Sequence, residues 1–266
     1  MEILDINTIF GSFPGRHADS TAESLVEVMS RHEISHALTL SSQGIYYHDM
    51  AGNQETINAC ERFRSALLPV GTVNPMSFWE ADDMLTQIAQ TSFSMFRFFP
   101  HAQGWPLDYA PFIRIVKLLS ECGKPLFERG ITLPQPTRGW RLWTDSGTPI
   151  LVSIERPGDA SKLAKCIADY PAPVVMVGVT SETIVEAMTV MLTCEQLMLE
   201  THRITMPDGL ARIRDSVGAQ RIVFGSGGPA LSTRAALNYV MKSSLTEDEK
   251  AAVLGGNASS IVTGGR

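Results

Sequence analysis

Two pairs of ionisable residues stand where apolar runs of the sequence end. Glu200 and His202 lie two positions apart at the end of one run, and Arg97 and His101 lie near the end of another. Residues two apart on a strand share a face, so we expect Glu200 to orient His202. An imidazole beside a carboxylate is a common general acid or base, and we interpret His202, Glu200 and His101 as candidate catalytic residues. The alternative for His202 is a strand-end side chain bonded to loop backbone.

Arg97 stands in an otherwise apolar run. A guanidinium stays charged in proteins, so a buried one needs a carboxylate or an anionic ligand. Two interpretations stay open, a buried ion pair with Asp5 or Glu128 and the bidentate capture of a substrate carboxylate. Asn7 follows Asp5 at strand spacing, and Glu128 and Glu155 each end an apolar run. We therefore take Arg97, Glu128, Asn7 and Glu155 as candidate substrate-binding residues.

The elements that would position these residues alternate along the whole chain. Amphipathic stretches separate nine strand-like runs, at 3–7, 37–41, 68–73, 95–99, 125–128, 150–155, 174–179, 197–201 and 221–225. Runs that are apolar through most of their length are typical of strands covered on both faces. Strand–helix alternation predicts parallel strands and right-handed crossovers. We expect a single domain over residues 1–266, an α/β fold of the (β/α)₈ TIM-barrel type. A doubly wound open sheet is the alternative, but neither GxGxxG nor GxxxxGK[ST] follows the first strand.

A barrel has eight strands, so one of the nine runs is surplus. The segment 131–148 is rich in Pro, Gly and Trp and predicts a long excursion around residues 130–148. Either 125–128 or 150–155 is the fifth barrel strand, and the sequence leaves both open. Capping boxes at 20–23, 77–80 and 246–249 predict helix starts.

Composition excludes several classes of protein. Of the 266 residues 44% are hydrophobic and 19% charged, which predicts a sizeable core. The net charge of −6 gives no reason to expect a nucleic-acid or anionic-membrane partner. Neither a signal-peptide pattern nor an apolar run of about 20 residues is found. Cys60, Cys122, Cys166 and Cys194 have no paired spacing and indicate reduced thiols. We expect a cytoplasmic protein with a small-molecule ligand.

Four segments resemble the amidohydrolase-2 (amidohydrolase-related) family of metal-dependent TIM-barrel hydrolases. Residues 4–11, Leu-Asp-Ile-Asn-Thr-Ile-Phe-Gly, stand where that family has its first-strand Asp-x-His-x-His. Residues 99–108 resemble the region after strand four. Residues 221–229, Arg-Ile-Val-Phe-Gly-Ser-Gly-Gly-Pro, match the eighth-strand pattern R-[IV]-[LV]-F-G-S-D-x-P, and Gly-Asn-Ala at 256–258 matches the closing motif. The correspondence runs from about residue 3 to 262.

The chain departs from this family at the metal ligands. Asn7 and Ile9 stand in place of two histidines, and Gly227 stands in place of the eighth-strand aspartate. The sixth-strand histidine position falls near 178–179 and the fifth-strand one near Glu128. Zinc needs three or four nitrogen, oxygen or sulfur donors, and Ile and Gly offer none. We therefore expect no metal cofactor, although a divalent ion is the family's norm.

The resemblance implies a hydrolase or lactonase, or a lyase or decarboxylase, that acts on a small carboxylated molecule. Some relatives open lactones without a metal by means of Arg and His, but they keep the eighth-strand aspartate. One hypothesis is a divergent enzyme that uses His202, Glu200, His101 and Arg97. The other is a catalytically silent barrel that binds a ligand or pairs with an active paralogue. A homodimer is compatible with either hypothesis.

Overall fold

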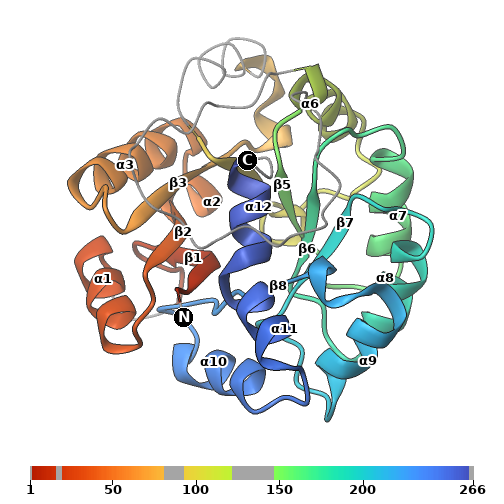
Figure 1. Cartoon of the computed structure of the whole chain (residues 1–266). Helices are drawn as coiled ribbons and strands as arrows, with labels where there is room; N and C mark the ends of the chain where they lie inside the picture. The colour runs from red at the N-terminus through yellow and green to blue at the C-terminus, as the bar shows by residue number, and fades with distance from the viewer. Residues whose placement is uncertain (1, 16–19, 81–92, 122–146, 264–266) are drawn as a thin grey trace.

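The computed structural model describes residues 2–15, 20–80, 93–121 and 147–263. These residues form eight parallel strands whose order in the sheet follows the sequence (Figure 1). The strands are β1 Leu4–Phe10, β2 His36–Ser41, β3 Leu67–Thr72, β4 Met95–Phe98, β5 Ile150–Ser153, β6 Val174–Val177, β7 Leu197–Glu200 and β8 Ile222–Val223. The prediction of a TIM barrel is confirmed.

The barrel closes between β1 and the segment that follows β8. The amide of Ile6 donates to the carbonyl of Phe224 at 3.0 Å, and the amide of Gly227 donates to the carbonyl of Asn7 at 2.9 Å. A parallel bridge between Thr8 and Gly228 continues this seam. The seam brings the end of the first strand beside the glycine-rich segment after the eighth.

Helices surround the strands, except that the last helix lies over the middle of the barrel (Figure 1). They are α1 Ala22–Arg31, α2 Gln43–Tyr46, α3 Asp49–Arg62, α5 Pro100–Gln103, α6 Ala110–Glu121, α7 Asp159–Cys166, α8 Ile184–Met191, α9 Gly209–Val217, α10 Thr233–Met241, α11 Glu247–Ala251 and α12 Asn257–Thr263. Two 3₁₀ segments, Pro75–Glu80 and Ala219–Arg221, and one π-helical segment, Ala252–Gly256, complete the described elements. Within the described residues, no helix is long and apolar enough to cross a membrane.

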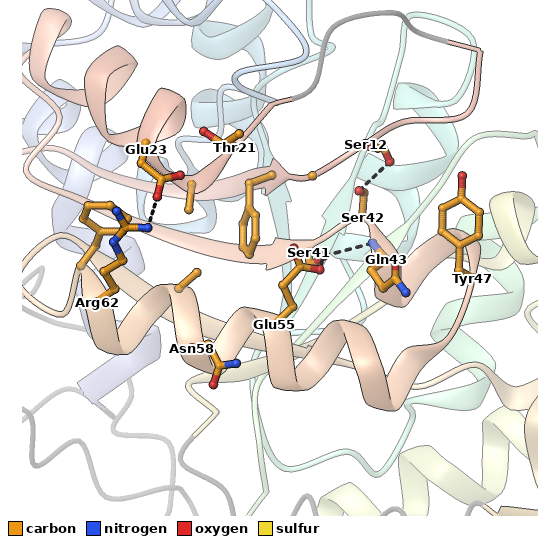
Figure 2. A pocket seen from close by; sticks show the side chains of 15 residues that line it. Ser12, Thr21, Glu23, Ser41, Ser42, Gln43, Tyr47, Glu55, Asn58 and Arg62 are labelled. Carbon is orange, nitrogen blue, oxygen red and sulfur yellow. Dashed lines mark hydrogen bonds and ion pairs between the residues drawn. The ribbon is translucent and has the colours of Figure 1, made fainter.

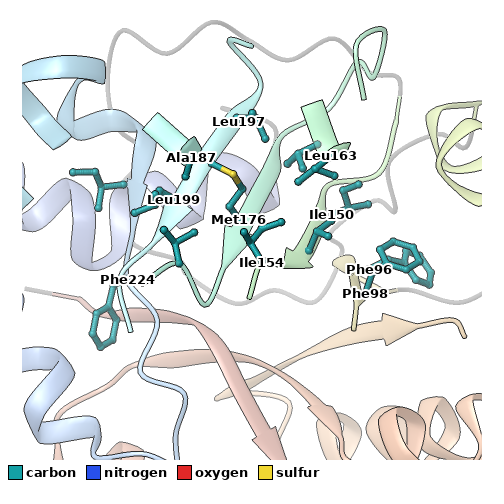
Figure 3. Close-up of a cluster of buried hydrophobic side chains, with 14 of the residues drawn as sticks. Phe96, Phe98, Ile150, Ile154, Leu163, Met176, Ala187, Leu197, Leu199 and Phe224 are labelled. Atoms are coloured by element: carbon teal, nitrogen blue, oxygen red, sulfur yellow. The ribbon is translucent and has the colours of Figure 1, made fainter. Parts of the chain in front are cut away.

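The strands are buried on both faces, as their apolar runs predict. Every residue of β2 to β8 is buried. One cluster fills the barrel interior and includes Leu4, Met95 and Val175, and the last helix, α12, adds Ile261 to it. A second cluster lies between the strands and the helices. Figure 3 labels ten of its members: Phe96, Phe98, Ile150, Ile154, Leu163, Met176, Ala187, Leu197, Leu199 and Phe224.

The structure decides between the two candidates for the fifth strand. Ile150–Ser153 pairs with β4 and β6 and is therefore β5. The run 125–128 lies outside the described residues, and so does the predicted excursion except for its last two positions, 147–148.

The helix starts were predicted with mixed success. The capping box at 246–249 is confirmed, because Thr246 and Glu249 each bond to the other's backbone amide. The box at 20–23 was misplaced by one residue. Thr21 is the cap of α1, and Ser20 pairs with Gly11 in an antiparallel bridge. The box at 77–80 was wrong, since Ser77 lies inside a 3₁₀ segment that begins at Pro75.

Two residues of the family-like motifs stabilise the fold. The Arg221 guanidinium donates to three backbone carbonyls within 191–197, at the end of α8 and the start of β7. The Asn257 amide donates to the carbonyls of Ala219 and Ile222 and so holds α12 against the beginning of β8. These motifs therefore identify the barrel's closing elements rather than chemistry.

Candidate active site

Four side chains from three strands form one connected group at the carboxyl ends of the barrel strands, which we name the Asn7 cluster: Asn7, Arg97, Glu200 and His202. The Asn7 Oδ1 atom accepts a hydrogen bond from Arg97 Nη1 at 2.5 Å. Its Nδ2 atom lies 3.2 Å from His202 Nδ1. The Glu200 carboxylate accepts the His202 backbone amide at 2.7 Å and also contacts His202 Nδ1. Asn7 therefore lies between the cation and the imidazole–carboxylate pair, hydrogen-bonded to Arg97 and packed against the His202 ring.

The ends of β7 and β8 explain why Glu200 fits inside the barrel. Met198, two positions earlier on β7, belongs to the interior cluster, and Glu200 follows it on the same face with no exposed surface. Gly225 provides the space. A Cβ atom there would lie 2.1 Å from Glu200 Oε1 and 2.7 Å from the Asn7 Cβ. The glycine of the Phe-Gly-Ser motif is thus required by the packing of the site, a role that sequence reasoning missed.

The Glu200 contact determines which nitrogen of His202 is available. A carboxylate only accepts hydrogen bonds, so His202 Nδ1 carries the proton that Glu200 accepts. The Nε2 atom is then the nitrogen that does not carry this proton. The His202 side chain is 10% exposed, so the ring lies at the boundary between the core and solvent.

Arg97 is a buried cation that lies against an aromatic ring. It is 5% exposed, and its guanidinium lies 4.7 Å from the centre of the Phe99 ring. Burial lowers its pKa to about 10, while the charge of Glu200 opposes this shift, so Arg97 stays protonated at neutral pH. Among the described residues no carboxylate lies within 4.0 Å of the guanidinium, and its Nε atom has no partner there. The direct ion pair with Asp5 is therefore not formed, and Glu128 lies outside the described residues.

Asp5 lies two residues before Asn7 on β1 and is buried. Its Oδ1 atom accepts the amides of Asn7 and Ser226, each at 3.0 Å. Its Oδ2 atom is buried and has no partner within the described residues. Burial raises the pKa of Asp5 to about 7, and the charge of Glu200 contributes to the rise. Sequence reasoning considered Asp5 only as an ion-pair partner and missed these backbone contacts.

His101 and Glu155 lie on the segments that follow β4 and β5. His101 lies in α5, beyond the end of β4 at Phe98, so strand periodicity does not extend to it. Its Nε2 atom lies 2.7 Å from Asp159 Oδ2, which also accepts the Glu155 amide at 3.0 Å. The Glu155 side chain is exposed, and its charge acts on Arg97. Tyr46 on α2 also acts electrostatically on Arg97 and was not considered from the sequence.

The position of the family's eighth-strand aspartate does not suit a side chain. Gly227 has a φ of +66°, and a Cβ atom there would lie 2.8 Å from Leu231 Cδ1 and 3.1 Å from His202 Cδ2. A left-handed backbone disfavours residues other than glycine. An aspartate at 227 would therefore need both a strained backbone and a shift of Leu231.

The oxygen atoms of the Asn7 cluster do not suit the binding of a divalent metal ion. The Asn7 oxygen is taken by Arg97, and both Glu200 oxygens are taken by His202. A cation placed among them would face the fixed positive charge of Arg97. Within the part of the chain that the structure describes, no group of three or more His, Cys, Asp or Glu side chains could hold a metal.

A separate cavity of about 480 Å³ lies between α1 and α3 (Figure 2). The Glu23–Arg62 ion pair stands at one end of it, and the bond from Ser42 to the Ser12 carbonyl stands toward the other. None of the members of the Asn7 cluster lines this cavity. It is therefore not part of the candidate active site.

Comparison with known proteins shows the fold. No family model matches the chain, and no curated protein matches it. A probable 2-pyrone-4,6-dicarboxylic acid hydrolase from Acinetobacter baumannii, with citric acid bound, is 12% identical with a TM-score of 0.66 over 98% of this chain and 99% of that one. A 5-carboxyvanillate decarboxylase from Novosphingobium aromaticivorans, complexed with manganese, is 11% identical with a TM-score of 0.68 over 98% and 96%. A putative amidohydrolase from Staphylococcus aureus is 11% identical with a TM-score of 0.68 over 98% and 99%. The chain therefore shares its barrel with hydrolases and decarboxylases, among which manganese occurs.

Proposed function

We propose that the protein is a divergent amidohydrolase-like enzyme, a hydrolase or a decarboxylase, that acts on a small carboxylated molecule without a metal ion. Arg97 binds the substrate carboxylate, and His202, oriented by Glu200, transfers the proton. The observation that carries this proposal is the Glu200–His202 pair, beside which the Asn7 side chain holds the Arg97 guanidinium.

The charge of Arg97, which has no carboxylate within 4.0 Å among the described residues, favours an anionic substrate. A buried cation needs a compensating charge or hydrogen bonds, and the described residues supply Arg97 with an amide oxygen and no carboxylate within 4.0 Å. A substrate carboxylate would provide both. The structurally similar enzymes support this choice, because a pyrone dicarboxylic acid and a carboxyvanillate are named as their substrates.

The proton transfer follows from the assignment of His202 Nδ1 to Glu200. In hydrolysis, Nε2 takes a proton from water as its oxygen adds to the carbonyl, and returns that proton to the leaving oxygen or nitrogen. In decarboxylation, the carbon–carbon bond breaks, CO₂ leaves, and the protonated ring gives its proton to the carbon that keeps the electron pair. Both reactions use the same imidazole and the same fixed positive charge.

The proposed absence of a metal cofactor rests on the donors of the Asn7 cluster. Their oxygens are already hydrogen-bonded, and Arg97 provides the positive charge that an ion would bring. Protein purified from medium supplemented with zinc and manganese should carry well under one equivalent of either ion by elemental analysis. About one tightly bound ion per chain would contradict this proposal.

The function is tested with a panel of lactones, amides and aromatic carboxylic acids. His202→Ala should lower turnover by roughly 10²–10⁴-fold, whereas Arg97→Met should mainly raise KM. His48→Ala is the matched control, because that imidazole is 60% exposed and caps α3. Each variant must melt close to the parent protein. Parental turnover in His202→Ala would refute the mechanism. If no compound turns over and Arg97→Met loses only stability, the catalytically silent barrel is the better description.

A further inference from the structure

Strand β1 contains an irregularity just where the Asn7 cluster begins. Asp5 pairs with Ala37 and Thr8 pairs with Thr39, so β1 advances by three residues while β2 advances by two. One extra residue in a strand is a bulge, and bulges re-aim side chains beside active sites. The sequence prediction that Asp5 and Asn7 share a face of a regular strand therefore fails at this point.

The bulge turns Asn7 toward the barrel interior. Ile6 already belongs to the interior cluster, and in a regular strand its neighbour Asn7 would point to the opposite face. Asn7 nevertheless bonds to Arg97, which lies on the same face of β4 as the interior residue Met95. Contact between Asn7 and the site thus depends on the local geometry between residues 5 and 8.

The Asp5 carboxylate accepts hydrogen bonds from two backbone amides beside the bulge. It accepts the Asn7 amide within the bulge, and it accepts the Ser226 amide in the segment that closes the barrel. Next along that segment, the Gly227 amide donates to the Asn7 carbonyl. Without an acceptor at Asp5, two buried amides would lose their partner, and such amides are rarely left unpaired.

We infer that Asp5 is a positioning residue of the site, whose carboxyl oxygen holds the β1 bulge against residue 226 so that Asn7 stays between Arg97 and His202. The inference rests on the proposed function for its catalytic consequence only. The His202 ring lies 3.2 Å from the Asn7 side chain, so a displaced Asn7 should alter the surroundings of the ring whether or not the protein turns over a substrate.

The experiment follows the ring nitrogens of His202 by ¹⁵N NMR, with the signals assigned through His202→Gln. Asp5→Ala removes the acceptor, whereas Asp5→Asn keeps one oxygen in the same place. Thr8→Val is the matched control, because Thr8 lies on the same strand as Asp5. The substitution removes a buried hydrogen bond from the Thr8 hydroxyl to the Leu38 carbonyl on β2. A merely structural role for Asp5 would lower stability in both Asp5→Ala and Thr8→Val but leave the His202 signals unchanged.

The expected result is a shift of the His202 Nδ1 and Nε2 resonances in Asp5→Ala, with parental positions in Thr8→Val and a near-parental pattern in Asp5→Asn. Where a substrate is known, kcat should fall about 10- to 100-fold in Asp5→Ala because the site is misplaced. Parental His202 signals in folded Asp5→Ala overturn the inference and leave the proposed function standing. Parental turnover in His202→Gln would overturn the proposed function and leave the inference about Asp5 standing.

If Asp5→Ala does not fold, Asp5→Ser takes its place. If neither folds, amide hydrogen exchange in the parent protein decides the matter. Protection of the Asn7 and Ser226 amides equal to that of neighbouring strand amides supports the inference, and rapid exchange of either overturns it.

Discussion

The substitution Asp5→Asn tests the electrostatics of the site, because it keeps a side-chain oxygen for the two backbone amides and removes the ionisable group. Burial, assisted by the charge of Glu200, raises the pKa of Asp5 from 3.8 to about 7. Between these values the folded protein binds a proton that the unfolded chain has released. The resulting contribution to stability is complete below about pH 4 and is lost as the pH rises through 7.

The size of the effect follows from the shift. The change from 3.8 to about 7 is roughly 3 pH units, which corresponds to about 4 kcal/mol at 1.36 kcal/mol per unit. Asparagine does not titrate, so Asp5→Asn should gain stability relative to the parent as the pH is raised from 4 to 8. The difference in the free energy of unfolding between Asp5→Asn and the parent at pH 8 should exceed the same difference at pH 4 by nearly this amount.

Urea unfolding at half-unit intervals between pH 4 and pH 8 measures the free energy of unfolding directly. The control is Asp169→Asn at an exposed position, which should change stability by less than about 0.5 kcal/mol at every pH. A constant difference between Asp5→Asn and the parent over the whole range would refute the reasoning, since it would mean that Asp5 titrates alike in the folded and unfolded chains.

Two further substitutions test the packing of the barrel. Gly225→Ala places a Cβ atom 2.1 Å from Glu200 Oε1, so it should destabilise the fold by about 1–3 kcal/mol and shift the His202 ring signals; an unchanged melting temperature would show that Glu200 lies elsewhere. Asn257→Ala leaves the Ala219 and Ile222 carbonyls without their donor and should cost about 1–3 kcal/mol while the signals of His202 stay parental.

The fold was predictable because its strands are apolar on both faces and alternate with amphipathic helices. The predicted run 95–99 and the observed strand Met95–Phe98 differ by one residue. The choice of the fifth strand was not predictable, because 125–128 and 150–155 have the same composition pattern and only pairing with β4 and β6 identifies Ile150–Ser153. Local patterns thus predicted the elements, but not which of two similar runs enters the sheet.

The candidate site was predictable only in part. The contact between Glu200 and His202 was predicted from their two-residue spacing and is present, but β7 ends at Glu200 and His202 lies in the turn after it. Asn7 was named as a candidate from the sequence, but the bulge that directs it was not predictable, because a single extra residue in β1 changes the face to which it points. Gly225 was missed for a different reason. Its role is the absence of a side chain, and that absence has meaning only beside the Glu200 carboxylate.

The differences from the metal-dependent pattern depend on one another. Asn7 offers Arg97 an oxygen acceptor, and it also lies beside the His202 ring. Gly227 leaves the volume beside that ring to Leu231, where an aspartate would bring a further negative charge beside Glu200 and Asp5. An arginine fixed in β4 supplies positive charge without requiring histidine ligands. Under the proposed function, restoring one metal ligand alone would leave Arg97 in conflict with the ion, and a metal site would require changes at 97, 7 and 227 together.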